Sequence, residues 1–295
     1  MYPAVIESYV APKTVQEALG ALAAALAAHG DDAHFIAGGQ SLMQAIKSRL
    51  VTPKCLVDLQ HVAELKGVRS DADGLRIGAM TRYREIATAE PLTGAYEALR
   101  DAASHVGDRQ VRNRGTIGGS LCWNYLAACM PAACIGVGAS VELLDSKGKR
   151  RTLLAEEFLG GPLETERQPD EILLAVLLPR AAAKTGSAYK KWGLVTDALP
   201  VVGVSAWVEL GADGRCRRAR LAVGGLASGP RRATAGEERM TGLARSDADG
   251  IGAAADAAAA ATDVQSDMWA DQSYRKTLIA ALAREVIALA FTRAG

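Results

Sequence analysis

The sequence lacks an excess of charge of either sign. Its 34 Lys and Arg residues are balanced by 33 Asp and Glu residues, which gives a formal net charge of +1. Nucleic-acid-binding domains usually carry a basic stripe with interleaved aromatic side chains, and no such stripe is found here. Nucleic acid is therefore not expected as a partner, and any anion-binding site must be built locally. A hydrophobic fraction of 49% with 23% charged residues is typical of a globular protein.

Segments that direct a chain to or across a membrane are also lacking. The first residues, MYPAVIESYVAPKT, have neither the charged start nor the apolar core of a signal peptide. No uncharged apolar run reaches the length of about 18 residues that a membrane-spanning helix requires. We therefore expect a cytoplasmic protein without membrane insertion.

Cysteine is scarce, and its spacing excludes the common metal and redox motifs. The five residues, an odd number, form no CxxC pair, so neither a zinc site nor a thioredoxin-like site is expected. Cys122, Cys129 and Cys134 cluster, but intervals of six and four residues match no common iron–sulfur motif. We predict free, buried thiols and no metal site in this chain.

Recognisable catalytic motifs are lacking as well. There is no GxxxxGK[ST] phosphate loop, no HExxH zinc motif, and no Ser/His/Asp or Cys/His set. The letters GIGAAA at 250–255 fit a dinucleotide fingerprint, but no strand precedes them, so the context of a Rossmann fold is missing. No catalytic residue is predicted. This absence is consistent with a cofactor that carries the chemistry while the protein binds and orients it.

What the sequence does have is two short glycine-rich stretches, far apart in the chain. The later one, GDRQVRNRGTIGGS (107–120), places three glycines among its last six residues, beside Thr116 and Ser120. Closely spaced glycines let successive backbone N–H groups converge on an anion, and the hydroxyl groups can add hydrogen bonds. Taken alone, such a stretch is more often a tight turn between two elements.

The earlier stretch, AGGQSL (37–42), follows a short apolar segment and precedes a helical pattern. Ser41 and Gln44 stand at capping-box spacing, so Ser41 is a candidate N-cap whose helix would direct free N–H groups back over Gly38 and Gly39. Two such anion sites predict a ligand with two phosphates, or one phosphate group bound from both sides.

Together, AGGQSL and GDRQVRNRGTIGGSL resemble the flavin-binding medium subunits of the molybdenum hydroxylases, the group of the aerobic carbon monoxide dehydrogenases and the flavin segment of xanthine dehydrogenases. The order and separation of the motifs fit, and the resemblance runs nearly end to end. It implies an α+β fold, with a two-subdomain FAD-binding fold of the vanillyl-alcohol oxidase / p-cresol methylhydroxylase type and a C-terminal α+β domain.

The resemblance also implies which residues contact FAD. The glycine stretches would hold its pyrophosphate, and Leu42 and Val106 would pack on the flavin ring or its edge. The AYKKWG segment matches a Tyr-x-Lys region, where a lysine could reach a phosphate or the ring. The predicted cofactor-binding residues are Ala37, Gly38, Gly39, Gln40, Ser41, Leu42, Val106, Thr116, Ile117, Gly118, Gly119, Ser120, Cys129, Tyr189, Lys190 and Lys191.

One segment departs from the family pattern. In NYLAACMPAA (124–133), Tyr125 and Leu126 stand where relatives have aspartate and proline, and Cys129 stands where many have an acidic residue near the adenosine half. We expect backbone contact in place of side-chain contact there.

By this resemblance the chain is an FAD-binding electron-transfer subunit of a heterotrimeric molybdenum-containing hydroxylase. Its partners would be a large molybdopterin subunit, where substrate is oxidised, and a small subunit with 2Fe-2S clusters, in a dimer of heterotrimers. The flavin would pass electrons from the clusters to NAD, oxygen or a quinone. Two alternatives stay open: a self-sufficient FAD-dependent reductase of the same fold, and an assembly protein without a cofactor.

The patterns predict an FAD-binding domain, 1–179, with subdomains 1–58 and 59–179, and a C-terminal domain, 185–295. A capping box at Thr14 and Glu17 begins the first helix. The other elements follow from hydrophobic periodicity and turn residues. The expected strands are 3–10, 33–37, 55–59, 75–80, a hairpin at 140–154, 171–179, and neighbouring antiparallel strands within 190–210 and 215–226; the other expected helices are 42–50, 94–106, 127–138, 247–263 and 274–293.

Overall fold

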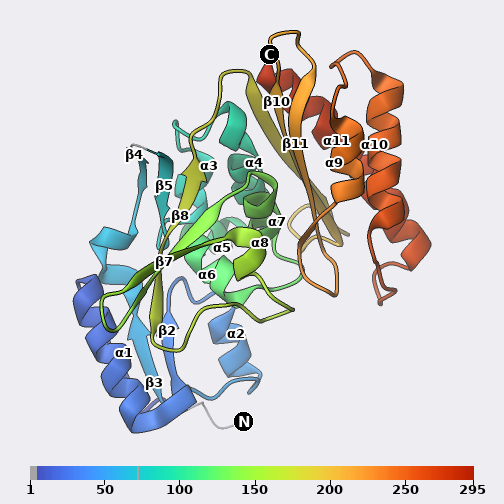
Figure 1. Ribbon diagram of the computed structural model, residues 1–295. Helices are drawn as coiled ribbons and strands as arrows, with labels where there is room; N and C mark the ends of the chain where they lie inside the picture. The colour runs from blue at the N-terminus through green and yellow to red at the C-terminus, as the bar shows by residue number, and fades with distance from the viewer. Residues whose placement is uncertain (1–4, 72) are drawn as a thin grey trace.

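The computed structural model describes residues 5–71 and 73–295. It contains three sheets and their helices, arranged one after another along the molecule. Figure 1 shows the N-terminal unit in blue at one end, a five-stranded sheet in the middle, and the C-terminal sheet with its orange and red helices at the other end. The first and last described residues, 5 and 295, therefore lie at opposite ends of the molecule (Figure 1).

The N-terminal unit is a parallel sheet in the order β1-β3-β2, with α1 packed beside it (Figure 1). Its elements are β1 (Ser8–Val10), α1 (Val15–His29), β2 (Ala33–Ile36), α2 (Leu42–Lys47) and β3 (Cys55–Asp58). The predicted capping box of α1 is present, because Thr14 Oγ1 accepts from the N–H of Glu17 at 3.1 Å and the Glu17 carboxylate accepts from the N–H of Thr14 at 3.2 Å. Helices connect the strands because parallel neighbours need a crossover.

Three details of this unit differ from the prediction. Ser41 stands at the N-cap position of α2, but its side chain makes no capping hydrogen bond, so the capping box predicted with Gln44 is wrong. Helix α2 ends at Lys47 instead of residue 50, because Arg49 takes the left-handed conformation with φ of 62°. The first strand begins at Ser8, and the first two residues of the predicted strand lie outside the described residues.

The middle unit is built on an antiparallel sheet in the order β4-β5-β8-β6-β7. Its strands are β4 (Val68–Asp71), β5 (Gly74–Gly78), β6 (Ser140–Asp145), β7 (Arg150–Leu154) and β8 (Glu171–Pro179). The central strand, β8, pairs with β5 on one side and β6 on the other, and nearly all of its side chains are buried. This explains why its sequence, EILLAVLLP, is an almost continuous apolar run and does not alternate.

Six helices accompany this sheet: α3 (Tyr83–Ala87), α4 (Glu97–His105), α5 (Arg109–Arg114), α6 (Ile117–Trp123), α7 (Cys129–Gly136) and α8 (Ala155–Phe158). The helices predicted at 94–106 and 127–138 correspond to α4 and α7. The short helices α5 and α6 were not predicted, although they occupy most of the glycine-rich stretch 107–120. Asp108 and Thr116 provide their N-caps, so this stretch is helical on both sides of Gly115.

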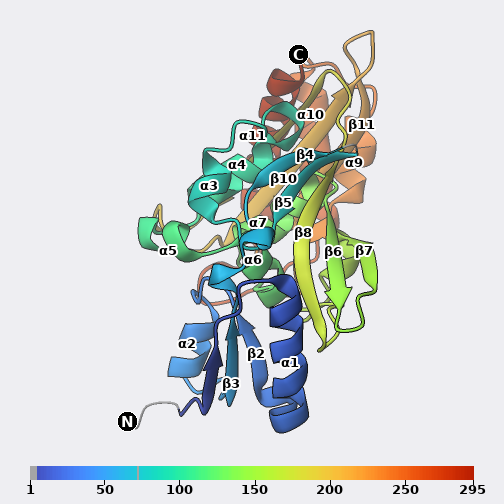
Figure 2. The same cartoon turned by 90° about the vertical axis from the view of Figure 1, so that its left-hand side faces the viewer.

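The C-terminal part is an antiparallel sheet in the order β12-β11-β10-β9, held between two helical layers (Figure 2). Its elements are β9 (Thr185–Trp192), β10 (Val202–Leu210), β11 (Cys216–Gly224), β12 (Arg231–Arg232), α9 (Thr234–Met240), α10 (Ala248–Ala261) and α11 (Gln272–Ala294). Alternate residues of β9 face opposite sides: Ala188 joins the core under α11, whereas Tyr189 joins the core of the middle unit. The sheet therefore connects both parts of the molecule.

The cysteines are all free thiols. Four are buried as predicted, and Cys122 is only half-buried. No helix among the described residues is long and apolar enough to cross a membrane. Within 5–71 and 73–295 no three His, Cys, Asp or Glu side chains are grouped so that they could hold a metal ion.

Candidate functional site

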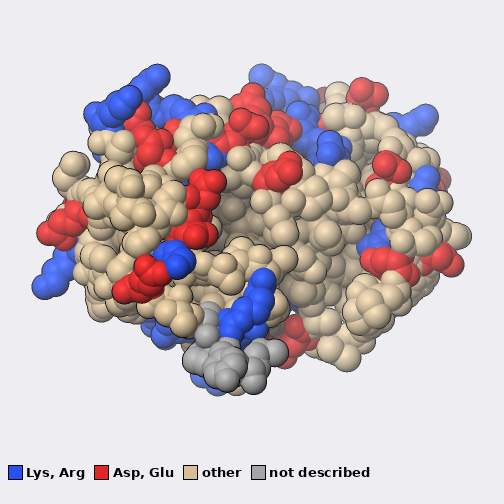
Figure 3. Space-filling model, turned by 90° about the horizontal axis from the view of Figure 1, so that it is seen from below, with Lys and Arg blue, Asp and Glu red and all other residues tan. Residues whose placement is uncertain are grey.

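A cavity of about 720 Å³ lies where the three units meet. Its walls come from residues 34–59 of the N-terminal unit, 79–173 of the middle unit, and 191–200 at the end of β9 and in the following loop. The volume is within the range of small-molecule and cofactor sites. Figure 3 shows one face of the molecule, on which basic and acidic side chains are interspersed around a hollow of mostly uncharged residues.

The two glycine-rich stretches meet at this cavity. A Cβ at Gly38 would lie 2.1 Å from the carbonyl oxygen of Arg114 and 2.9 Å from the Cα of Gly115. Both distances are far below a van der Waals contact, so only glycine at position 38 permits this approach. The contact brings the two stretches together although they are far apart in the sequence.

The earlier stretch leaves its backbone donors free. Among the residues that the structure describes, the N–H groups of Gly39, Gln40 and Ser41 have no acceptor. Gly39 has φ of 73°, a conformation that glycine adopts without strain. The Ser41 hydroxyl likewise has no partner within the described chain. Consecutive unpaired N–H groups at a cavity wall are suited to an anionic ligand.

The later stretch uses its backbone differently. The N–H of Ile117 donates to the carbonyl of Thr81 at 3.1 Å, and the N–H of Gly118 donates to the carbonyl of Ala79 at 2.8 Å. A Cβ at Gly118 would lie only 2.7 Å from the Cβ of Ala79. The glycine at 118 therefore permits close packing against the segment 79–81, and it frees no donor.

Thr116 accepts hydrogen bonds from the next two N–H groups of this stretch. Its Oγ1 accepts from the N–H of Gly119 at 3.1 Å, and its carbonyl accepts from the N–H of Ser120 at 3.1 Å. The stretch thus contributes the glycine surface and the side chain of Ser120 to the cavity wall, not an array of free backbone donors.

Most of the residues predicted to bind the cofactor line the cavity. They are Ala37, Gly38, Gly39, Gln40, Ser41, Leu42, Val106, Thr116, Gly118, Gly119, Ser120, Cys129 and Lys191. Three of the predicted residues are not among the lining residues. Ile117 and Tyr189 are buried in the core, and Lys190 forms an exposed ion pair with Glu285 on α11.

The cavity favours negative charge. Lys191 and Arg167 line it, and no Asp or Glu does so among the described residues. Backbone carbonyls anchor both side chains: Lys191 Nζ donates to Ala198, and Arg167 Nη1 donates to Gln168 at 2.9 Å and to Glu171 at 2.8 Å. Neither cation is neutralised by a carboxylate at these contacts, so both can attract an anionic ligand.

Sequence reasoning missed Arg167, because it lies in a loop outside any motif. It also missed His34, Tyr83, Leu199 and Pro200, which line the cavity from three different parts of the chain. Burial, helped by the charge of Arg167, lowers the pKa of His34 below its ordinary value, so this ring is neutral at pH 7.

The cysteines at the cavity are not activated nucleophiles. Burial raises the pKa of both Cys122 and Cys129, and only minor opposing effects come from Arg167 at the former and from Tyr189 and Lys191 at the latter. Both thiols are therefore protonated at neutral pH. The described lining residues are suited to binding and orienting a ligand.

Comparisons with known proteins agree with this arrangement. Residues 4–181 match the family described as the FAD binding domain in molybdopterin dehydrogenase, and residues 187–290 match the CO dehydrogenase flavoprotein C-terminal domain. The carbon monoxide dehydrogenase medium chain of Hydrogenophaga pseudoflava is 31% identical over 97% of each chain. Subunit alpha of the 6-hydroxypseudooxynicotine dehydrogenase complex of Paenarthrobacter nicotinovorans is 32% identical, covering 97% of this chain and 95% of that one.

A solved structure is similar over the whole fold. A carbon monoxide dehydrogenase from Hydrogenophaga pseudoflava, which lacks the Mo-pyranopterin moiety of its cofactor, matches with a TM-score of 0.90 and 32% identity over 99% of both chains. The predicted fold class, an FAD-binding domain followed by a C-terminal α+β domain, is therefore confirmed. FAD is also confirmed as the cofactor of this type of chain.

Proposed function

This chain belongs to the family of FAD-binding medium subunits of molybdenum hydroxylases, and from that premise we propose that it transfers electrons within such a complex. One observation carries the proposal. The two glycine-rich stretches meet at a cavity that has free backbone donors, two cations and no lining carboxylate within the described chain. These features suit a ligand with a diphosphate bridge.

The residues of the cavity fit FAD in their chemistry. We assign the free N–H groups of Gly39, Gln40 and Ser41 to the pyrophosphate, with the side chain of Ser41 as a further donor. Leu42 and Val106 provide apolar surface for the ring system. The opposite wall consists of Thr116, Gly118, Gly119 and Ser120, and Cys129 and Lys191 complete the set.

Contacts from Tyr189, Lys190 and the side chain of Ile117 stay predictions that the lining does not support. Tyr189 is 1% exposed, and Lys190 is paired with Glu285. Of the AYKKWG segment, only Lys191 lines the cavity. We therefore give the cationic contact to Lys191 alone.

When bound, FAD supplies the oxidation–reduction chemistry, accepting electrons from iron–sulfur clusters and delivering them to an external acceptor. The protein's own residues bind the cofactor, orient it and exclude water around it. No residue of this chain is assigned a catalytic role, because the buried thiols and the neutral His34 have no acid–base partner at the cavity wall.

The partners in this proposal are a large molybdopterin subunit and a small subunit with 2Fe-2S clusters, arranged as a dimer of heterotrimers. The curated relatives support this, since they are named as a medium chain and as a subunit of a dehydrogenase complex. The proposal keeps the FAD-binding domain at 1–179 and the C-terminal domain at 185–295, and a cytoplasmic location.

Reconstitution of the purified chain with FAD tests the proposal. We expect a flavin absorbance spectrum that remains after removal of free FAD, and no oxidation of an organic substrate by the chain alone. Retained FAD with NADPH-dependent turnover by the isolated chain would favour a self-sufficient reductase. Failure to retain any FAD would favour an assembly protein that has lost its cofactor.

A further inference from the structure

The C-terminal part supplies one wall of the cavity. Lys191, at the end of β9, and Leu199 and Pro200, in the loop 193–200 that follows, are lining residues. This loop rests directly on the FAD-binding part, since a Cβ at Gly107 would lie 2.2 Å from the carbonyl oxygen of Asp197. The position of β9 relative to α4 and Gly107 therefore sets how closed the cavity is.

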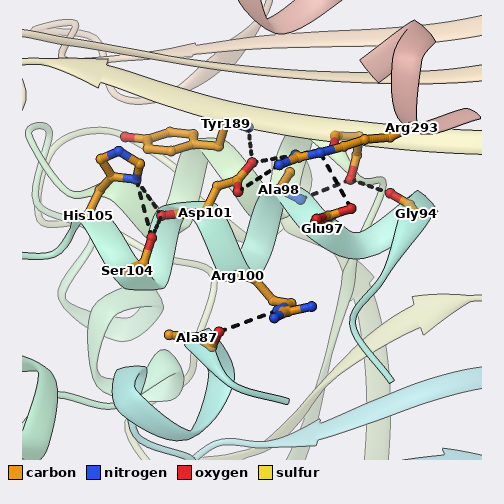
Figure 4. Close-up of polar contacts among 11 residues, drawn as sticks. Ala87, Gly94, Glu97, Ala98, Arg100, Asp101, Ser104, His105, Tyr189 and Arg293 are labelled. Carbon is orange, nitrogen blue, oxygen red and sulfur yellow. Dashed lines mark hydrogen bonds and ion pairs between the residues drawn. The ribbon is translucent and has the colours of Figure 1, made fainter. Parts of the chain in front are cut away.

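A cluster of charged side chains joins α4, β9 and α11 (Figure 4). Asp101 of α4 accepts from Arg293 of α11 in a two-bond pair, with distances of 2.6 Å to Nη1 and 3.1 Å to Nη2. The same carboxylate accepts from the backbone N–H of Tyr189 in β9 at 3.1 Å. Arg293 also donates to the carbonyl of Ser187 at 2.8 Å, and its Nε lies 3.4 Å from Glu97.

A second link lies beside this cluster. The buried hydroxyl of Ser187 accepts from the N–H of Ala98 at 3.0 Å and donates to the carbonyl of Gly94 at 3.2 Å. The Asp101 and Arg293 side chains are each only 19% exposed. A two-bond guanidinium–carboxylate pair with this little solvent is much stronger than an exposed ion pair, so it can hold two parts of a protein together.

Asp101 and Tyr189, whose N–H it binds, each stand just before the cavity wall in their own elements. Helix α4 carries Asp101 and ends at His105, and the next two residues, Val106 and Gly107, line the cavity. Strand β9 carries Tyr189, whose N–H is bound by Asp101, and Lys191 lines the cavity two residues later. The cluster therefore links α4 and β9 at positions just before each element reaches the cavity wall.

We propose that Asp101 and Arg293 are positioning residues for the cofactor cavity. Their ion pair holds β9 against α4, and it thereby seats the loop 193–200 on Gly107 and keeps the cavity closed around FAD. The inference rests on the proposed binding of FAD in this cavity. Without the pair, the C-terminal part can shift on the helical layer beneath it, so the cavity opens and the ring of the cofactor is held less uniformly.

The test compares three single variants with the wild-type chain. Asp101→Asn and Arg293→Met break the pair. Arg284→Met is the matched control, because Arg284 also lies on α11 but pairs with Asp256 of α10 at 3.5 Å, with both side chains more than half exposed. FAD affinity is measured by fluorescence titration, and visible circular dichroism reports how the bound flavin is held.

We expect Asp101→Asn and Arg293→Met to bind FAD at least about fivefold more weakly and to lose dichroic intensity, as a coupling between domains would produce. Arg284→Met is expected to match the wild type. A lower melting temperature with unchanged affinity and dichroism in both pair variants would overturn the proposal, because the pair would then be structural only.

If Asp101→Asn does not fold, Glu97→Gln replaces it. Glu97 is the second carboxylate beside Arg293, so its removal leaves the two-bond pair in place but takes away one of the two carboxylates that hold the guanidinium. The expected change has the same direction and a smaller size, and an unchanged dichroism spectrum would again contradict the proposal. Failure of the wild-type chain itself to bind FAD would contradict the proposed function instead.

Discussion

The two glycine-rich stretches line one cavity, yet they use glycine for opposite purposes. In 37–42, Gly39 supplies a left-handed turn and three successive N–H groups remain free. In 115–120, Gly118 permits contact with Ala79, and the N–H groups from 117 to 120 are all bonded within the protein. The two stretches are therefore similar in composition but differ in role. The earlier one leaves N–H groups free to bind a ligand, and the later one packs against the rest of the protein.

The largest effect is expected where the two stretches touch. Gly38→Val places a side chain 2.1 Å from the Arg114 carbonyl oxygen, and backbone cannot yield at low cost. We expect a loss of about 3 kcal/mol or more in the free energy of unfolding and no measurable FAD binding. Gly20→Ala is the control, because no atom lies within 4 Å of its new Cβ, and it should stabilise α1 by up to about 1 kcal/mol. Thermal melts and FAD titration measure both, and wild-type FAD affinity in Gly38→Val would contradict the contact.

Glycine-to-alanine substitutions in the two stretches should distinguish a packing role from a binding role. Gly118→Ala overlaps Ala79, so we expect a loss of about 1–3 kcal/mol in stability and a smaller change in FAD affinity. Gly39→Ala meets only side chains, Met43 at 3.3 Å and Ile36 at 3.7 Å, but strains a φ of 73°, at a cost of about 1 kcal/mol. Its effect on FAD affinity should be the larger of the two, because it turns the free donors. If both variants lost stability and FAD affinity in the same proportion, the distinction between a packing stretch and a binding stretch would be wrong.

A pair of hydroxyl deletions sharpens the same comparison. The Ser41 hydroxyl makes no hydrogen bond within the described chain, so Ser41→Ala should leave stability within about 0.5 kcal/mol and weaken FAD binding about tenfold. Thr116→Val removes the cap of α6 and should cost about 1 kcal/mol in stability, with little effect on affinity. Denaturant midpoints and FAD titrations are measured for both variants. The reverse pattern would show that Thr116 binds FAD and that Ser41 stabilises the fold.

The smallest effect concerns the thiols near the later stretch. Burial raises the pKa of Cys122 and Cys129, so the reactive thiolate is rarer at every pH than in an exposed cysteine. Alkylation by iodoacetamide should be slow at pH 7 and should accelerate only as the pH rises above the ordinary range of a thiol. Bound FAD should slow it further, since both residues line the cavity. Mass spectrometry of the labelled peptides measures this, and fast labelling at pH 7 would contradict the burial.

The sequence predicts the cavity better than it predicts the backbone around it. Most residues predicted from the two glycine motifs line the cavity, because the motifs mark the place where a side chain would obstruct the approach of Gly38 to Gly115. The sequence does not predict which backbone N–H groups of the two motifs are free. That depends on the pairing of 117–118 with 79–81, a contact between segments with no shared motif. Helices α5 and α6 were missed because six or seven residues are too short for a periodic signal.

Strand alternation explains the AYKKWG segment. Successive side chains of β9 point to opposite faces, so Lys190 faces α11 and reaches Glu285, while Tyr189 and Lys191 share the other face. Of these two, only Lys191 is far enough along the strand to reach the cavity. Applying this alternation to the segment would have removed Lys190 from the prediction, whereas the depth of Tyr189 depends on how β9 packs on the middle unit.

The central position of β8 has a consequence for how the protein is made. Both glycine stretches have been synthesised by residue 120, but β5 and β6 gain their shared neighbour only when residues 171–179 follow. At about 5–20 residues per second, this gap lasts roughly 3–12 s. During that interval two strand edges are unpaired and the wall behind the cofactor is unfinished. We therefore expect the nascent chain to bind FAD only after its synthesis has passed Pro179.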